Sequence, residues 1–337
     1  MTVLAQIKGL FSHQAVAASL EQLPPMETAI INTLFPVQVE HPWSHIGIGE
    51  LENVVGTQAV VRRDGQPIPF QGRGDDVNIF SPRPIKPSID IAASEINDLK
   101  AIWDNKMTMQ QFVGRQVDKL RRLVRNTTEA MASVVATTGK LSWPSRLEGG
   151  GFESYELDFG GVQKLDPTAK WTAGSPPPLR TVYAWLSGLK RAVTKVGGGG
   201  GKFKFLAGEE AFGILLAFAE NWKSTAGGLG PVSLTLEEGK IIIGGFEITE
   251  VSEEYQSPLN NQWVPKIPPK CLLGYASQRT GQVFYLAIDS ISNNGAPTPF
   301  YVVVEQKPGD AAISLIAQAK PLPVADLRSH ILSEVVA

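Results

Sequence analysis

The chain has 337 residues, which is enough for two or three compact units with substantial cores. Its 31 lysines and arginines stand against 33 aspartates and glutamates, so no overall basic field favours nucleic-acid or membrane binding. Hydrophobic residues make up 43% and charged residues 19%, which is typical of an ordered protein with large buried protein–protein surfaces. The 33 glycines and 24 prolines predict many turns and extended segments and disfavour a helix bundle.

Three features of the sequence bear on the compartment of the protein and on membrane association. The single cysteine, Cys271, excludes an internal disulfide, and its apolar neighbours indicate a buried thiol rather than a nucleophile. The longest apolar stretch, residues 211–219, has half of the roughly 18 residues that a membrane span needs. The N-terminus lacks the basic region of a signal peptide. We therefore expect a cytoplasmic, unprocessed chain that does not cross a membrane.

The N-terminal part predicts extended structure. Residues 1–45 combine short apolar groups with Pro24, Pro25, Pro36 and Pro42, a pattern typical of an arm that lies on another surface.

A projecting hairpin is expected next. Residues 54–70 contain two β-prone runs on either side of Asp64 and Gly65, a pair that strongly favours a type I′ turn. Arg62 and Arg63 lie in the hairpin, and Arg73 follows it. Its apolar content is too small for a core of its own, so this ribbon is expected to project and pack on a neighbour.

One long helix is the clearest element of the sequence. The segment Met107–Thr138 has no proline, and its apolar residues recur at steps of three and four, which predicts an amphipathic helix. Gly139 is expected to end it. Between Lys100 and Lys140, eight basic residues stand against three acidic ones. This surplus fits either a solvated helix face or a contact with the phosphates of a polyanion.

The rest of the chain mixes helices and strands. Amphipathic helices are expected at residues 179–196 and 209–222, separated by a five-glycine loop. The expected strands lie at residues 155–159, 203–206, 233–236, 240–243, 246–251, 272–275, 282–288, 300–305, 313–317 and 330–336. Because the strands do not alternate strictly with helices, we expect an α+β fold and disfavour a barrel or a doubly wound sheet.

The sequence carries no convincing catalytic or cofactor motif. Gly201 and Lys202 are followed by Phe203 where a phosphate-binding loop needs a serine or threonine. His41 and His45 have the spacing of helical metal ligands, but a proline interrupts the turn and no glutamate lies between them. No Gly-x-Ser-x-Gly elbow accompanies the four histidines. We expect no enzyme activity, no cofactor and no metal.

The order of these elements resembles that of the lambda-like major capsid protein family of tailed bacteriophages. The local matches are the hairpin 60–65 leading to 84–87, the strand-to-helix segment 205–218, the Leu273-Gly274-Tyr275 strand with Arg279 and Gly281, and the tail 314–326 with its final strand. Together they cover about residues 50–337.

This resemblance implies the Hong Kong ninety-seven type of capsid fold. The implied parts are an N-terminal arm over residues 1–50, an extended β-hairpin loop over 51–92, a peripheral domain over 93–178 with a spine helix at about 107–138, a mixed α+β axial domain over 179–270, and strands over 271–337 that return to the peripheral domain. The extended loop would lie over the adjacent subunit, so Arg62, Arg63, Asp64, Gly65 and Arg73 become candidate inter-subunit residues.

The implied function is that of a head-shell subunit assembling into hexamers and pentamers around double-stranded DNA. Arg121, Arg122 and Arg125 would be candidates to face that DNA. A separate scaffolding protein, a portal and a decoration or cement protein are implied as partners, with assembly in the host cytoplasm and residence in the virion. Covalent crosslinking of subunits is not expected. Two alternatives remain at this point: the shell protein of a cellular nanocompartment, and an unrecognised enzyme.

Overall fold

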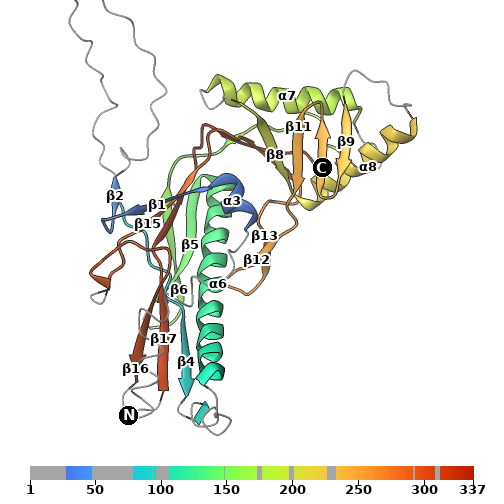
Figure 1. The fold of residues 1–337 in the computed structure, drawn as a ribbon. Coiled ribbons are helices and arrows are strands. Elements are labelled where there is room, and N and C mark those ends of the chain that lie inside the picture. Colours follow the sequence, from blue (N-terminus) through green and yellow to red (C-terminus); the bar gives the residue numbers. More distant parts are fainter. Residues whose placement is uncertain are drawn as a thin grey trace, which may run out of the picture.

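The computed structural model describes residues 28–47, 79–92, 94–95, 106–147, 149–172, 177–196, 201–225, 233–290, 293–307 and 312–337. These residues form two lobes, one built along the helix α6 and the other around a seven-stranded sheet (Figure 1). The α+β class expected from the sequence is confirmed, and the domain boundaries implied by the resemblance stay a prediction.

Helix α6, Lys106–Thr138, is the spine of the first lobe (Figure 1). Its N-terminal half packs Val113, Val117, Leu120 and Val124 against a three-stranded sheet of order β16-β17-β4. The strands of this sheet are β4 Ser88–Ala92, β16 Tyr301–Gln306 and β17 Ala312–Gln318. The predicted periodicity is confirmed because the apolar stripe, repeating every three to four residues, faces one sheet.

The C-terminal half of α6 packs on a second sheet, of order β1-β15-β18. The strands are β1 Val37–His41, β15 Gln282–Leu286 and β18 Pro321–Val324. Helix α3, Ala29–Leu34, lies on the same core, and its Ile30, Ile31 and Leu34 are at most 1% exposed. The extended arm expected over residues 1–45 is therefore wrong for residues 28–45, because Ile30, Ile31, Leu34 and Phe35 lie in the core of the subunit itself and β1 pairs with its β15. Residues 1–27 lie outside the described residues.

Short ribbons complete the first lobe. The pair β2 Ile46–Gly47 and β3 Ile79–Phe80 lies on either side of residues 48–78, which contain most of the predicted loop and lie outside the described residues. The last part of the predicted loop is described and includes β3 and β4. The hairpin β5 Lys140–Arg146 and β6 Phe152–Asp158 follows α6 directly. The hairpin β12 Glu254–Gln256 and β13 Trp263–Pro265 lies beside α6.

The second lobe is a mixed sheet of order β7-β19-β14-β8-β11-β10-β9, covered by two helices. The strands are β7 Gln163–Lys164, β8 Phe203–Ala207, β9 Leu234–Glu237, β10 Lys240–Ile243, β11 Phe246–Glu250, β14 Cys271–Ala276 and β19 His330–Glu334. The helices are α7 Leu179–Lys195 and α8 Glu209–Thr225. Leu186, Leu189, Phe205 and Leu215 fill the core between helices and sheet.

Several helices and strands begin or end at residues other than those predicted from the sequence. The strand expected at 155–159 begins at Phe152, and the helix expected at 209–222 continues to Thr225. The last strand ends at Glu334, and only a single bridge, Trp171 to Val336, continues the pairing. Pairing partners and helix caps set these ends, and neither can be derived from local periodicity.

Candidate assembly surfaces

The short helix α3 is held by a carboxylate from the spine helix. Glu129 of α6 accepts hydrogen bonds from the backbone N–H groups of Ile30, at 2.6 Å, and Ile31, at 2.8 Å. These N–H groups belong to the first turn of α3, where Thr28 makes no side-chain cap. Glu129 is only 1% exposed. The Glu129 carboxylate therefore caps the N-terminus of α3, 98 residues away in the chain, and its negative charge interacts favourably with the helix dipole.

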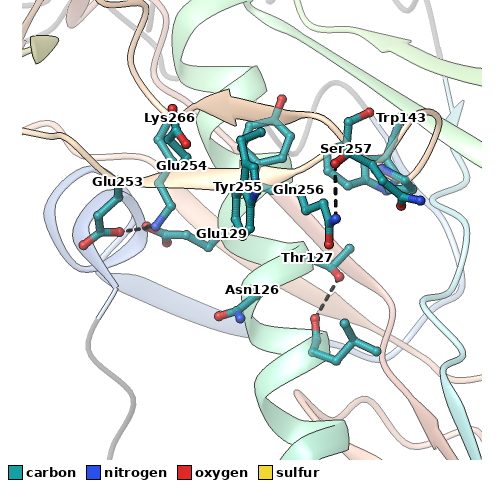
Figure 2. Close-up of a pocket in the computed structure, with 15 residues that line it drawn as sticks. Asn126, Thr127, Glu129, Trp143, Glu253, Glu254, Tyr255, Gln256, Ser257 and Lys266 are labelled. Carbon is teal, nitrogen blue, oxygen red and sulfur yellow. Dashed lines mark hydrogen bonds and ion pairs between the residues drawn. The ribbon is translucent and has the colours of Figure 1, made fainter.

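A buried lysine, Lys266, completes this network (Figure 2). Lys266 Nζ lies 3.2 Å from Glu129 Oε1 and also forms an ion pair with Glu253. The Lys266 carbonyl accepts a 2.5 Å hydrogen bond from Ser133 Oγ on α6. The network thus links α3, the spine helix and the segment that carries the β12–β13 hairpin. Buried charges of this kind are stable only when paired and hydrogen-bonded, as they are here.

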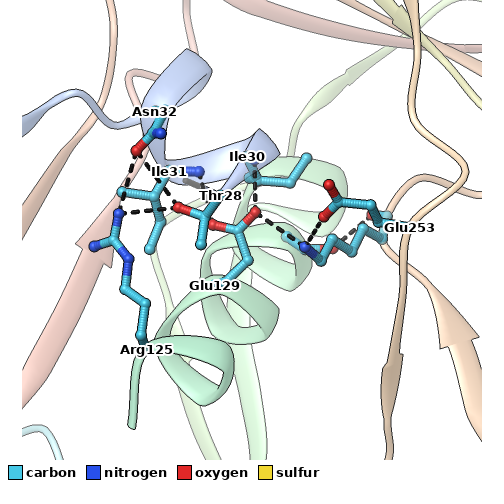
Figure 3. A network of polar contacts seen from close by, with 9 residues as sticks. Thr28, Ile30, Ile31, Asn32, Arg125, Glu129 and Glu253 are labelled. Atoms are coloured by element: carbon cyan, nitrogen blue, oxygen red, sulfur yellow. Dashed lines mark hydrogen bonds and ion pairs between the residues drawn. The ribbon is translucent and has the colours of Figure 1, made fainter. Parts of the chain in front are cut away.

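The three predicted DNA-facing arginines lie on α6 in different surroundings. Arg125 Nη2 donates to Thr28 Oγ1, at 2.9 Å, and to Asn32 Oδ1, at 3.2 Å, so its guanidinium faces α3 (Figure 3). Arg122 is exposed and pairs with Asp118 one turn earlier, at 2.8 Å. Arg121 is half-buried. That these three arginines face DNA remains a prediction.

The predicted inter-subunit residues Arg62, Arg63, Asp64, Gly65 and Arg73 lie outside the described residues. The structure does show where their segment starts and ends. Ile46 pairs with Phe80, and Gly47 pairs with Ile79, so residues 48–78 leave and return at one place. This is the arrangement that a projecting loop requires.

A groove of about 620 Å³ runs between α6 and the β12–β13 hairpin (Figure 2). Leu123, Asn126, Thr127, Glu129 and Ala130 line it from the spine helix. The opposite side comes from the hairpin and from β5, and its lining residues are Trp143, Glu253, Glu254, Tyr255, Gln256, Ser257, Pro258, Asn261, Trp263 and Lys266. The buried network of Glu129 and Lys266 therefore forms one end of an open surface feature.

Large apolar side chains are exposed at this groove. Trp263 is 64% exposed and Leu123 is 52% exposed, and Leu259, at 60%, lies in the turn of the same hairpin. The rings of Trp143 and Tyr255 pack at 5.8 Å between centroids. Clustered exposed apolar residues with a polar rim are typical of protein-interaction surfaces.

Sequence reasoning missed this site. Glu129 and Lys266 are separated by 137 positions, so no local pattern connects them. One signal was present: Glu129 is the only charged residue between Arg125 and Lys140. An isolated charge in the apolar half of a helix indicates a specific buried partner.

The chemistry of the described residues does not include a metal site. No group of three or more histidine, cysteine, aspartate or glutamate side chains in the described ranges could hold a metal ion. Burial raises the pKa of the Cys271 thiol to about 11, so it is protonated at neutral pH. Among the same residues, no helix combines the length and the hydropathy that spanning a bilayer requires.

His330 is a buried titratable residue at the start of β19. Its Nδ1 donates to the Asp326 carbonyl at 2.8 Å, and burial lowers its pKa below the usual 6.5. The unfolded chain therefore binds a proton at this imidazole more readily than the folded chain does. The contribution of His330 to stability is fully present above pH 6.5 and is lost as the pH falls below that value.

We expect the difference in the free energy of unfolding between the wild-type protein and His330→Asn to decrease by up to about 1.4 kcal/mol per pH unit below pH 6.5. The asparagine amide keeps a donor near the position of Nδ1 without titrating. Urea unfolding at pH 7.5, 6.5 and 5.5 measures this difference, in which other titrating groups cancel. A constant difference would contradict the assignment of a buried neutral His330.

Comparison with known proteins identifies the family. The family model described as phage major capsid protein E matches residues 12–333, nearly the whole chain. A solved prophage protein from E. coli CFT073, titled a putative capsid protein, has 18% identity, covers 98% of both chains and superposes with a TM-score of 0.57. A phage-related protein from Bordetella bronchiseptica RB50 has 13% identity, 95% coverage of both chains and a TM-score of 0.53. The search of curated proteins gives no significant match.

The two solved structures share the fold of this chain, and the family model covers both lobes and the segments between them. The resemblance to tailed-phage capsid subunits is thereby confirmed, and the nanocompartment alternative is not favoured. The chain belongs to the phage major capsid protein E family.

Proposed function

We propose that this chain is the repeating subunit of an icosahedral phage head, arranged in hexamers and pentamers around double-stranded DNA. The observation that carries the proposal is the family match over residues 12–333, which includes both lobes. A structural role in the virion follows from the family. Hexamers, pentamers, DNA contact and assembly in the host cytoplasm belong to this proposal, as do a scaffolding protein, a portal and a decoration protein as partners.

The exposed surface supports repeated contacts between copies. Nine large apolar side chains are well exposed among the described residues, and they lie in both lobes: Val37, Trp43, Leu123, Leu147, Phe152, Leu165, Val196, Leu259 and Trp263. Head-to-tail contacts of different patches close into rings, and contacts between rings then close a shell. Apolar residues spread over several patches suit this arrangement better than one self-complementary face.

Velocity sedimentation of the purified protein, with and without a candidate scaffolding protein, tests the proposal. We expect a uniform, fast-sedimenting particle, or rings of five and six copies, beside free subunits. A single monomer or dimer boundary at every concentration, with and without scaffold, would contradict it.

Deleting residues Arg62–Phe70 is expected to abolish particle formation and leave the subunit folded. The reason is that the β2–β3 pair closes the base of residues 48–78, and the described cores are formed by residues outside the deleted segment. Circular dichroism and thermal unfolding check the fold, and sedimentation checks assembly.

A matched variant replaces the same nine residues by glycine and serine, which keeps the length of the loop. If the loop acts through its side chains, this variant also fails to assemble. Normal particles from the deletion variant would overturn the assignment of the loop to the inter-subunit contact.

A further inference from the structure

The second lobe carries a segment of sequence without negative charge. Residues 167–208 contain seven lysines and arginines and no aspartate or glutamate, although the whole chain has a formal net charge of −2. Two of these cations are neutralised from outside the segment, because Lys170 pairs with Glu334 and Lys204 pairs with Glu247. Four of the other five lie on helix α7: Arg180, Lys190, Arg191 and Lys195.

Three of these cations share the outermost face of α7. Arg180, Arg191 and Lys195 follow one another at steps of eleven and four residues, so they lie within about 60° of one another around the helix axis. All three are exposed, and the buried Leu186 and Val193 lie on the opposite side of the helix. None of the three forms an ion pair with a described residue. This row of positive charge, the α7 face, lies on the outside of the second lobe (Figure 1).

Helix stability does not account for the α7 face. A helix dipole favours cations in the last turn, and only Lys195 lies there. Arg180 lies in the first turn, where the dipole disfavours a positive charge and no acidic residue compensates it. A negatively charged partner along the helix would compensate the whole row.

The residues between the cations favour phosphates over an acidic protein as this partner. Ala184, Ser187 and Gly188 lie on the same face and are small, so a backbone of phosphates can approach the helix closely. No large apolar side chain of α7 is exposed. Protein interfaces depend on apolar and aromatic anchors at their centre, whereas protein–DNA interfaces are polar and positively charged.

The length of the α7 face also fits DNA. Arg180 and Lys195 are about 22 Å apart along the helix, and B-DNA carries about one phosphate charge per 1.7 Å of its axis. Each cation can therefore contact a phosphate of a duplex that lies along α7. The arginines of α6 are less available, because Arg125 donates to Thr28 and Asn32 and Arg122 pairs with Asp118.

We infer that the α7 face binds the phosphate backbone of double-stranded DNA without sequence preference, through Arg180, Arg191 and Lys195. This inference rests on the proposed function, which supplies the DNA. It assigns the DNA contact to the second lobe.

Binding of a short fluorescent DNA duplex to full-length, unassembled subunits tests the inference. Fluorescence anisotropy gives the affinity for two unrelated sequences between about 50 and 200 mM salt. The test variant combines Arg180→Gln, Arg191→Gln and Lys195→Gln. The control combines Lys140→Gln, Lys240→Gln and Lys307→Gln, which removes the same net charge from partly exposed lysines that pair with acidic residues. Circular dichroism checks that both variants are folded.

We expect the wild-type protein to bind both sequences equally and to lose at least about 40-fold in affinity over this range of salt, because three phosphate contacts each add about 0.9 to the slope of log affinity against log salt. The test variant is expected to lower that slope by about 2.7, and the control variant is expected to keep it. Arg180→Lys combined with Arg191→Lys is expected to keep the slope as well, because a phosphate contact requires the charge and not the guanidinium.

Equal slopes for the wild-type protein and the test variant, or the same loss in the control variant, would overturn the inference. Binding of poly-L-glutamate by the wild-type protein without binding of DNA would assign the α7 face to an acidic protein and would also overturn it. Velocity sedimentation of the same proteins reports on the proposed function separately. Particles formed by a wild-type protein whose subunits do not bind DNA through α7 would contradict this inference alone.

Discussion

Replacing Glu129 by alanine is expected to lower the free energy of unfolding by about 3–5 kcal/mol, because the substitution removes one partner of a buried charge pair. The variant leaves Lys266 without its buried partner and the N–H groups of Ile30 and Ile31 without an acceptor. Urea unfolding, with the slope checked for constancy, measures the loss.

Two controls separate this network from surface charge. Glu153→Ala removes an exposed carboxylate that pairs with Arg83, and its cost is expected to stay within about 1 kcal/mol. Glu129→Leu combined with Lys266→Met removes both charges, and we expect it to be more stable than Glu129→Ala. Equal stability of Glu129→Ala and the wild-type protein would contradict the structural role given to the carboxylate.

Replacing Gly139 by alanine is expected to lower the free energy of unfolding by about 2–6 kcal/mol, as backbone strain and overpacking each contribute about 1–3 kcal/mol. Gly139 ends the spine helix at a φ of +77°, where a side chain is strained. A Cβ at this position would lie 2.1 Å from the carbonyl oxygen of Gly160, which is backbone and has little freedom to move.

Gly161→Ala is the matched control for this prediction. Gly161 lies next to the contacted residue, its φ is ordinary, and a Cβ there would meet nothing within 4 Å. Its effect is expected to stay within about 0.5 kcal/mol. Thermal or urea unfolding of the two variants measures both values. A small effect at Gly139, comparable to that at Gly161, would contradict the close packing of the helix end.

The sequence predicts the elements whose signal is local. The periodic apolar stripe of α6 and its end at Gly139 both follow from neighbouring residues, and the structure agrees. The turn predicted at Asp64 and Gly65 lies outside the described residues. The strand β18 was not predicted because Pro321 and Pro323 argue against a strand; prolines are tolerated there because β18 is the edge of its sheet.

Features that depend on contacts between residues far apart in the sequence cannot be predicted from local patterns. Helix α3 has six residues and no side-chain cap of its own, so nothing local distinguishes it from an arm. Strand β1 pairs in parallel with β15, nearly 250 positions later. The groove requires the β12–β13 hairpin to lie beside α6, where Lys266 and Glu129 form an ion pair across 137 positions of sequence. Local sequence carries no information on such contacts.

Electron microscopy of the purified protein, expressed alone and with a candidate scaffolding protein, tests the central claim most directly. We predict closed shells of uniform diameter, built of five- and six-fold clusters in which each copy shows the two lobes described here. A protein that remains a well-behaved monomer or dimer in every preparation, at high concentration and with scaffold present, would contradict the assignment as a head-shell subunit.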